Sequence, residues 1–365
     1  MREERSCSVC GAAQEDLEAF EGQMLCPSCL EDRTCLCQRC GQRFWKDQNA
    51  GDEEQPLCPE CFEMYYTTCS ECGTVLPLGE AYYDDDGDRE LCWACYNQSH
   101  QERAIQDYYY KPEPVFYGEG NRFFGVELEV DQGGELNRNA RRLLEIANQG
   151  EDRLYIKHDG SLGEGFELVS HPMTLDYHCR EMPWPGLLQA SREMGYRSHQ
   201  ASTCGLHVHV NREAFGETER EQEACIARIL YFFERNWEEL LKFSRRTRRQ
   251  LERWADRYGY KEQPREILDH AKKGGHGGRY SCVNLQNEAT VEFRIFRGTL
   301  KWNTFVATLQ LVNRVCDVAL YLSDQELKAM TWSSFAAGCQ EPELVQYLKE
   351  RRLYVNEPIE SEEEV

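Results

Sequence analysis

The sequence predicts an α+β domain that follows a tandem array of small cysteine-rich modules. Cysteines gather near the N-terminus, where 13 of the 19 lie between Cys7 and Cys95. Segments that alternate apolar and polar residues, which is typical of half-buried strands, begin only after residue 121. Segments with apolar residues at helical spacing lie between and after those strands. We therefore expect at least two domains, with a boundary near residue 110.

Changes in composition along the chain divide it further. Two prolines in the segment before residue 121 favour extended backbone, and the last residues are strongly acidic. We expect five successive regions: cysteine modules at 1–97, a linker at 98–121, the α+β domain at 122–325, a helical segment at 326–356 and a disordered acidic tail at 357–365.

The cysteine modules form a repeat. Three Cys-x-x-Cys-Gly knuckles are each followed by a second Cys-x-x-Cys knuckle after 15, 17 or 19 residues, and the glycine is expected to adopt positive φ. Cysteines paired in this way in a reducing compartment indicate metal ligands, and four thiolates suit structural Zn²⁺. About three zinc ions are expected, bound by Cys7, Cys10, Cys26, Cys29, Cys37, Cys40, Cys58, Cys61, Cys69, Cys72, Cys92 and Cys95.

The spacing leaves two questions about these modules open. Neighbouring knuckles could pair as in zinc ribbons, or the pairs could interleave as in LIM-type modules. Cys35 remains without a partner in either arrangement. Because such closed sites lack an open coordination position, we expect the modules to bind a substrate or partner.

Net charge and hydropathy restrict the partners. The chain carries −22, and the first 110 residues alone carry −15 when Lys and Arg are counted against Asp and Glu. Binding to nucleic acid requires a basic face, so neither DNA nor RNA is an expected partner. No segment approaches the roughly 18 apolar residues of a membrane span, and the N-terminus lacks an apolar leader segment. We expect a soluble cytoplasmic protein.

Three segments of the α+β domain alternate with period two: Val126–Val130, Leu206–Val210 and Val291–Ile295. In each one, a face of Val, Leu, Ile or Phe opposes a face that carries only groups able to bind cations or phosphate. Residues i and i+2 share a face of a strand, about 6.5 to 7 Å apart. The polar positions are Glu127 and Glu129, His207 and His209, and Glu292 and Arg294.

A hairpin is predicted between these strands. Residues 154–162 and 165–172 read as its two arms, with Asp159 and Gly160 near the turn. Its second arm adds Glu167 to the set of carboxylates. Several carboxylates on one concave face would repel each other and lose hydration together, so bound divalent cations are expected there.

At this point the chain resembles the amidoligase family of carboxylate–amine ligases, whose fold is that of glutamine synthetase and glutamate–cysteine ligase. The resemblance runs from about Tyr110 to about Leu322. It rests on motifs in a fixed order, namely Tyr110 to Pro112, Phe124 to Val130, His158 to Leu162, Glu167 to Ser170, Cys204 to Val210, Arg279 and Tyr280 with Asn284, and Thr290 to Leu300.

This resemblance implies a cupped antiparallel sheet that grips Mg-ATP, and amide formation through an acyl phosphate. Implied Mg²⁺ ligands are Glu127, Glu129, Glu167, His207 and Glu292. Arg294 would face the transferred phosphoryl group, and the weaker candidates for the nucleotide are Lys157, His209, Arg279 and Arg297. We expect Asp159 to accept the proton of the attacking amine.

Two other functions compete with this interpretation. One is a metal-dependent hydrolase with a zinc centre at His207, His209 and a glutamate, and the other is a non-catalytic interaction protein. The basic run from Ser244 to Arg249 fits either a solvated helix face or recognition of an acidic substrate or phosphate. Gly274 to Gly278 fits either a mobile lid or a plain linker. The resemblance is compatible with a peptide, a protein side chain, a cell-wall component or a small amino acid as substrate.

Overall fold

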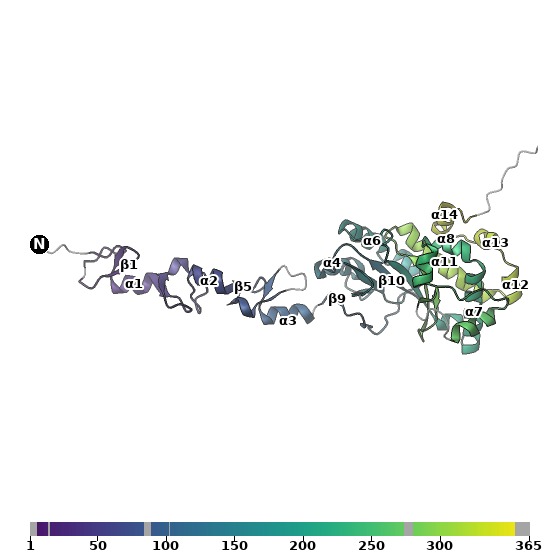
Figure 1. Cartoon of the computed structure of the whole chain (residues 1–365), viewed down its shortest axis with the longest axis horizontal. Coiled ribbons are helices and arrows are strands. Elements are labelled where there is room, and N and C mark those ends of the chain that lie inside the picture. Colours follow the sequence, from purple (N-terminus) through teal and green to yellow (C-terminus); the bar gives the residue numbers. More distant parts are fainter. Residues whose placement is uncertain (1–5, 14, 84–88, 102, 274–279, 355–365) are drawn as a thin grey trace, which may run out of the picture. The chain divides into compact units, whose positions relative to one another are not determined.

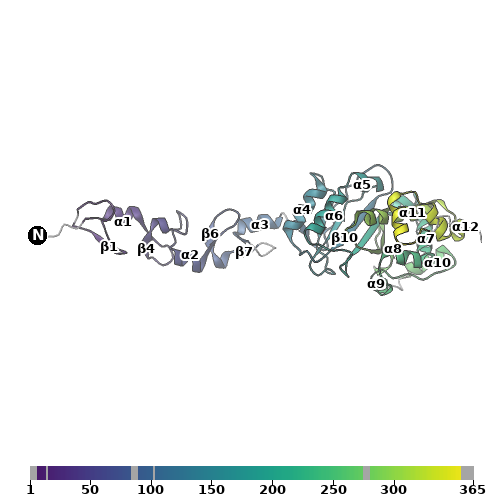
Figure 2. The ribbon, with the colours of Figure 1, turned by 90° about the horizontal axis from the view of Figure 1, so that it is seen from above.

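The computed structural model describes residues 6–13, 15–83, 89–101, 103–273 and 280–354. Its residues cluster into two compact units, Met1–Arg103 and Ala104–Val365 (Figures 1 and 2). Each unit is described by itself. Three features predicted from the sequence lie outside the described residues: Arg279, the glycine run 274–278 and the tail 357–365.

Helices in the first unit begin inside the second knuckle of each module. The helices are α1 (Pro27–Arg33), α2 (Pro59–Tyr65) and α3 (Trp93–Gln101). Proline at the first helical position suits α1 and α2, because its missing N–H would be unpaired there anyway. Four short antiparallel hairpins complete the unit: β1 (Glu18–Phe20) with β2 (Gln23–Leu25), β3 (Thr34–Leu36) with β4 (Arg43–Trp45), β5 (Tyr66–Thr68) with β6 (Val75–Pro77), and β7 (Tyr82–Tyr83) with β8 (Glu90–Leu91).

Each module buries only a handful of apolar side chains. The leucines that precede the second knuckles, Leu25, Leu57 and Leu91, are almost fully buried in three separate small clusters. Clusters of this size are too small to stabilise a module without further cross-links. Cross-links through the cysteines are therefore expected to stabilise this unit.

A seven-stranded sheet organises the second unit, in the order β14-β15-β13-β10-β12-β11-β9. All neighbouring pairs are antiparallel except β9 with β11. The α+β class predicted from the sequence is confirmed. The strands are β9 (Ile105–Gln106), β10 (Phe124–Val130), β11 (Leu154–Lys157), β12 (Phe166–Ser170), β13 (Gly205–Asn211), β14 (Val283–Asn284) and β15 (Thr290–Arg297).

Helices cover the apolar face of the sheet. Figures 1 and 2 show α4 beside α6 and α7 beside α11. Apolar residues at helical spacing after the last strand, namely Phe305, Leu309, Val312, Val315 and Val318, are buried within α11. The helices are α4 (Asn137–Asn148), α5 (Leu175–Arg180), α6 (Trp184–Glu193), α7 (Glu219–Arg235), α8 (Trp237–Ser244), α9 (Arg248–Trp254), α10 (Pro264–Lys272), α11 (Trp302–Tyr321), α12 (Asp324–Ala329), α13 (Trp332–Ala337) and α14 (Pro342–Glu350).

Two segments differ from the simplest sequence interpretation. The segment 98–121 contains β9, and its residues Ala104 and Ile105 are buried against the second unit. The basic run does not continue a helix, because Arg245 takes the left-handed conformation (φ 61°) between α8 and α9. In the described residues, every helix is too short or too polar to cross a membrane.

Candidate functional site

Polar residues of four adjacent strands meet on the face of the sheet opposite the helices. The register places Glu127 of β10 directly across from His207 of β13, and Glu129 across from Glu167 of β12. On the other side of β13, His209 pairs with Glu292 of β15. Directly opposite residues of an antiparallel pair point to the same face, so the predicted strand faces combine into one surface.

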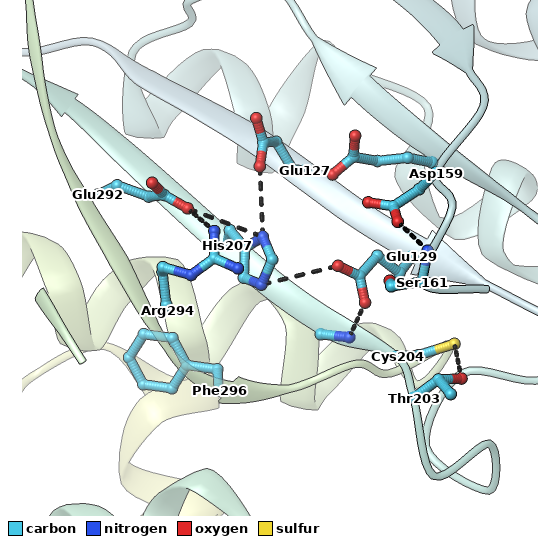
Figure 3. A network of polar contacts seen from close by, with 12 residues as sticks. Glu127, Glu129, Asp159, Ser161, Thr203, Cys204, His207, Glu292, Arg294 and Phe296 are labelled. Atoms are coloured by element: carbon cyan, nitrogen blue, oxygen red, sulfur yellow. Dashed lines mark hydrogen bonds and ion pairs between the residues drawn. The ribbon is translucent and has the colours of Figure 1, made fainter. Parts of the chain in front are cut away.

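The first candidate metal group is Glu127, His207 and Glu292. His207 Nδ1 lies 3.2 Å from Glu127 Oε2 and 3.9 Å from Glu292 Oε1. One ligand atom from each residue falls within 4.8 Å of the other two. Figure 3 shows both carboxylates directed at the imidazole, and Glu292 and His207 are almost completely buried.

A second candidate group shares the same histidine and consists of Glu129, Glu167 and His207. His207 Nε2 lies 3.8 Å from Glu129 Oε1. The other oxygen of Glu129 accepts a hydrogen bond of 2.5 Å from the Gly205 backbone N–H. Because Glu129 and Glu167 are only 5% and 3% exposed, water stabilises their charges poorly.

Electrostatics at the site reflect this crowding of carboxylates. Burial, together with the charges of Glu127 and Glu129, holds the pKa of Glu167 well above its usual range. Burial also acts on Glu127, but His209 and His207 outweigh it and lower the pKa of that carboxyl. The pKa of His209 is raised because Glu127 outweighs the effect of burial. A buried carboxylate that resists ionisation beside other carboxylates is a group that a divalent cation would stabilise in its charged form.

The donor set fits a hard cation. Four glutamates and one shared histidine supply mainly oxygen ligands, which Mg²⁺ prefers over the sulfur and nitrogen sets typical of Zn²⁺. His209 stands beside Glu127, with 3.3 Å between Nε2 and Oε1, but it belongs to neither group. It is placed to orient Glu127.

Two cations border the carboxylates. Arg294 forms an ion pair with Glu292, and Lys157 Nζ lies 3.1 Å from Glu167 Oε2. The Nε atom of Arg294 is buried and has no hydrogen-bond partner among the described residues. An unpaired guanidinium donor beside a cavity is suited to an anionic ligand.

These residues line a cavity of about 2000 Å³, here called the sheet cavity. Asp159 also lines it, and its Oδ1 accepts a 2.7 Å hydrogen bond from the Ser161 backbone N–H. Aromatic rings of Tyr108, Trp254 and Tyr280 contribute to the wall. A cavity of this volume has room for a nucleotide and a second substrate.

The weaker candidates for nucleotide binding lie in two different pockets. Lys157 and His209 line the sheet cavity, whereas Arg297 lines a separate pocket. Two residues that the sequence assigned no role also contribute. Asn284 Nδ2 donates to Glu292 Oε2 at 2.8 Å, and Arg246 lines the cavity near Glu129. In the sequence, Asn284 stood out only as a motif position, and Arg246 only as part of the basic run.

Cysteines in the first unit form three groups of four, and within each group the Sγ atoms all lie within 4.8 Å of one another. Neighbouring knuckles pair in sequence order, as in zinc ribbons, and Cys35 lies outside the groups. Gly11, Gly41 and Gly73 adopt φ of 75°, 71° and 76°, so the predicted positive φ is confirmed.

The donor set of these groups fits Zn²⁺. Backbone hydrogen bonds from Cys10 and Cys26 lower the pKa of Cys7 to about 6, which favours the thiolate. Four thiolates held this close together match a tetrahedral structural site.

The fold and site define a protein of the α+β class with clustered carboxylate, imidazole and guanidinium side chains on one sheet face. The family model described as "Putative amidoligase enzyme" matches residues 147–316. This match confirms the predicted resemblance to amidoligases and supports an amide-bond-forming ligase in general. No curated protein matches the chain.

Solved structures give two further similarities. A bifunctional glutathione synthetase from Pasteurella multocida is 14% identical, with a TM-score of 0.37, over 63% of this chain and 46% of that chain. The complex between the prokaryotic ubiquitin-like protein Pup and its ligase PafA gives 10% identity and a TM-score of 0.29, over 63% of this chain and 56% of that chain. The chain thus spans about half the length of either match.

Proposed function

We propose that this chain is an ATP- and Mg²⁺-dependent carboxylate–amine ligase that forms an amide through an acyl phosphate. One observation carries the proposal: two carboxylate groups that share His207 stand next to an arginine with a free donor, on the wall of one large cavity. Metals bridged to phosphate oxygens, with a cation facing the transferred group, are what phosphoryl transfer requires.

The two groups would each hold one Mg²⁺, which would neutralise phosphate charge when bound. Glu127 and Glu292 would serve the first position and Glu129 and Glu167 the second. His207 would complete one of the two, because a neutral imidazole offers a single lone pair. The short hydrogen bond from the Gly205 N–H orients Glu129, and Asn284 orients Glu292. These contacts fix the carboxylates before any ligand arrives.

Arg294 would stabilise charge on the transferred phosphoryl group. A carboxylate oxygen of the acid substrate attacks the γ-phosphorus of ATP, the bond to the bridging oxygen breaks, and ADP leaves. Lys157, which also lines the cavity and pairs with Glu167, is a further cation near the carboxylate groups. Both cations reduce the repulsion between the acid substrate and the triphosphate.

Amide formation completes the reaction. The amine nitrogen attacks the acyl carbon, inorganic phosphate leaves, and the amine proton passes to a carboxylate. Asp159 is assigned as this base, because it lines the cavity and keeps one oxygen free of the Ser161 hydrogen bond. Tyr108, Trp254 and Tyr280 offer flat surfaces for the nucleotide base.

The zinc modules would bind the substrate or a partner. On the third module, Trp93 is 56% exposed, and its ring centroid lies 5.1 Å from that of Tyr82 and 6.0 Å from that of Tyr96. An exposed aromatic cluster on a small rigid module is typical of a peptide- or protein-binding surface. A zinc hydrolase is less well supported, because His207 and His209 fall in no common metal group among the described residues.

Calorimetric titration of ATP tests the proposal. ATP is expected to bind the purified chain in the presence of Mg²⁺ and to bind at least about tenfold more weakly in Mg²⁺-free buffer. ATP binding that is absent, or equally strong without Mg²⁺, would rule out a metal-bridged triphosphate at this site.

A further inference from the structure

A second cavity of the second unit, about 650 Å³ in volume, is here called the basic pocket. Its walls include an imidazole, an ammonium group and several guanidinium groups. Its cationic residues are Lys242, Arg245, Arg246, Arg297 and Arg351, and His199 supplies the imidazole. The pocket adjoins the part of the basic run that does not form a helix.

The left-handed turn at Arg245 builds one wall of the pocket. With φ at 61°, the chain reverses between α8 and α9 and directs the guanidinium group inward. Arg245 Nη1 donates to His199 Nδ1 at 3.0 Å, and Nη2 donates to the Arg297 carbonyl at 3.1 Å. A left-handed conformation is uncommon for arginine, and these two contacts hold it.

A β-bulge brings Arg297 to the same pocket. Leu206 pairs with Phe296 and Val208 pairs with Phe293, so β15 has one extra residue opposite His207. This extra residue changes the alternation, and Arg297 therefore returns to the sheet face that carries Arg294. The pocket is consequently continuous with the polar face of the sheet.

Most cations of the pocket lack an ion-pair partner among the described residues. Lys242, Arg245, Arg297 and Arg351 form no ion pair with any carboxylate in the described part of the chain. The one acidic residue of the wall, Glu238, is 2.6 Å from Arg248.

Two donor atoms beside the pocket also lack a hydrogen-bond partner among the described residues. The Nε atoms of Arg245 and Arg297 are buried without a hydrogen-bond partner among the described residues. Burial, together with Arg245, Arg297 and Arg351, lowers the pKa of His199 to about 4, so that this imidazole stays neutral and accepts from Arg245. Unpaired cations and unpaired donors in one pocket predict an oxyanion ligand.

Arg246 connects the basic pocket to the sheet cavity, because it lines both. Its side chain donates to the Phe296 carbonyl at 3.1 Å and crosses over Gly205. A Cβ on Gly205 would lie 2.7 Å from Arg246 Nη2 and 2.6 Å from His207 Nε2, so a side chain at this position would displace both groups. One side chain therefore separates the basic pocket from the shared histidine of the metal groups.

We propose that the basic pocket binds a multivalent oxyanion, a phosphate or polycarboxylate group on the acid substrate, while the reacting carboxylate occupies the sheet cavity. The proposal rests on the ligase function above and specifies its substrate as polyanionic. A ligand with two or more negative charges matches the four unpaired cations better than a single carboxylate does. The site would select substrates by a group remote from the new bond.

Titrations of inorganic pyrophosphate and of citrate into the full chain, in Mg²⁺-free buffer, test the pocket directly. Without Mg²⁺, the carboxylates of the sheet cavity repel both probes. Arg297→Gln and Lys242→Gln are each expected to weaken binding at least about tenfold, and Arg297→Lys by less. Arg142→Gln, at an exposed arginine of α4, is the matched control and should bind like wild type. Thermal unfolding of each variant checks its fold.

The outcomes separate the pocket from the ligase function. Tighter pyrophosphate binding assigns a phosphorylated acid, and tighter citrate binding assigns a polycarboxylic acid. Mg-ATP affinity should stay within about twofold of wild type in Lys242→Gln, and a parallel loss would show that the nucleotide occupies the pocket, contrary to the proposal. Probe binding that is equal in wild type and variants would also refute it. A chain that binds no Mg-ATP but keeps the probe result would overturn only the ligase function.

Discussion

Glu127 and His207 are direct cross-strand partners, with 3.2 Å between Glu127 Oε2 and His207 Nδ1. This contact joins the two central strands of the polar sheet face. Since His207 also lies 3.8 Å from Glu129 and 3.9 Å from Glu292, it stands at the centre of both candidate metal groups. The sheet register therefore assembles the site.

Substitution of the carboxylates by amides tests the metal groups. Glu127→Gln and Glu292→Gln should each weaken Mg²⁺-dependent ATP binding at least about tenfold, because the amide keeps the volume but loses the charge that Mg²⁺ prefers. Calorimetry measures the affinity. Glu193→Gln, at an exposed glutamate of α6, should bind ATP like wild type. ATP affinity unchanged in both site variants would remove these glutamates from the metal groups.

Zinc content tests the cysteine groups. Elemental analysis of the reduced, purified chain should find about three zinc ions, since twelve thiolates form three groups of four. Cys37→Ser should lower the count to about two and unfold its module. Cys35→Ser is the matched control, because Cys35 lies outside the groups, and should leave three. A wild-type count near one or zero would contradict the assignment.

Truncation tests the independence of the second unit. A fragment of residues 104–365 should fold and bind Mg-ATP, because all residues of the sheet cavity lie within it. Removal of residues 1–121 should instead destabilise the fragment. That deletion takes away β9 and the hydrogen bond from the Val115 N–H to His171 Nδ1.

Circular dichroism and ATP titration compare the two fragments. A folded 104–365 fragment that does not bind ATP would contradict the assignment of ATP binding to the second unit. Equal melting temperatures of the two fragments would show that residues 104–121 contribute nothing to the fold.

A buried histidine predicts acid sensitivity. His178 Nε2 donates to the Phe124 carbonyl at 2.9 Å while Nδ1 accepts from Trp184 Nε1 at 3.1 Å, and burial lowers its pKa to about 4. In the unfolded chain its pKa is near 6.5. As pH falls below 6.5, His178 binds a proton in the unfolded state but not in the folded state. The free energy of unfolding therefore decreases until about pH 4.

The expected loss from His178 is about 2 kcal/mol between pH 7 and pH 5. Urea unfolding at both pH values measures it. His178→Gln should be less stable at pH 7 but should lose about 2 kcal/mol less than wild type on acidification. An identical pH dependence in wild type and variant would show that His178 remains exposed to protons in the folded chain.

Alternation of residue types was enough to predict the strands and the faces of Glu127, His207 and Glu292, because a period of two translates directly into sheet faces. The matched spacing of the Cys-x-x-Cys pairs was likewise enough to predict three groups of four cysteines. Knuckle pairing in sequence order could not be predicted, since both arrangements satisfy the same spacing.

Other features depend on tertiary structure and leave no pattern in the sequence. The two residues of β9 are too few for a periodicity, and they pair in parallel with a strand about 50 residues later. Arg245 sits in a run that reads as a helix face, and only its contacts with His199 and Arg297 reveal the left-handed turn. The bulge opposite His207 likewise depends on the pairing of two distant strands.

Hydroxylamine trapping tests the central claim most directly, because hydroxylamine replaces the unknown amine. The full chain, Mg-ATP and hydroxylamine are incubated with pools of carboxylic acids, and acyl hydroxamate, ADP and AMP are quantified. The account predicts hydroxamate and ADP in equal amounts, and a rate on the order of a hundredfold lower in Arg294→Ala, which loses the cation that faces the phosphoryl group. AMP in place of ADP, or a wild-type rate in Arg294→Ala, would contradict phosphoryl transfer at this site.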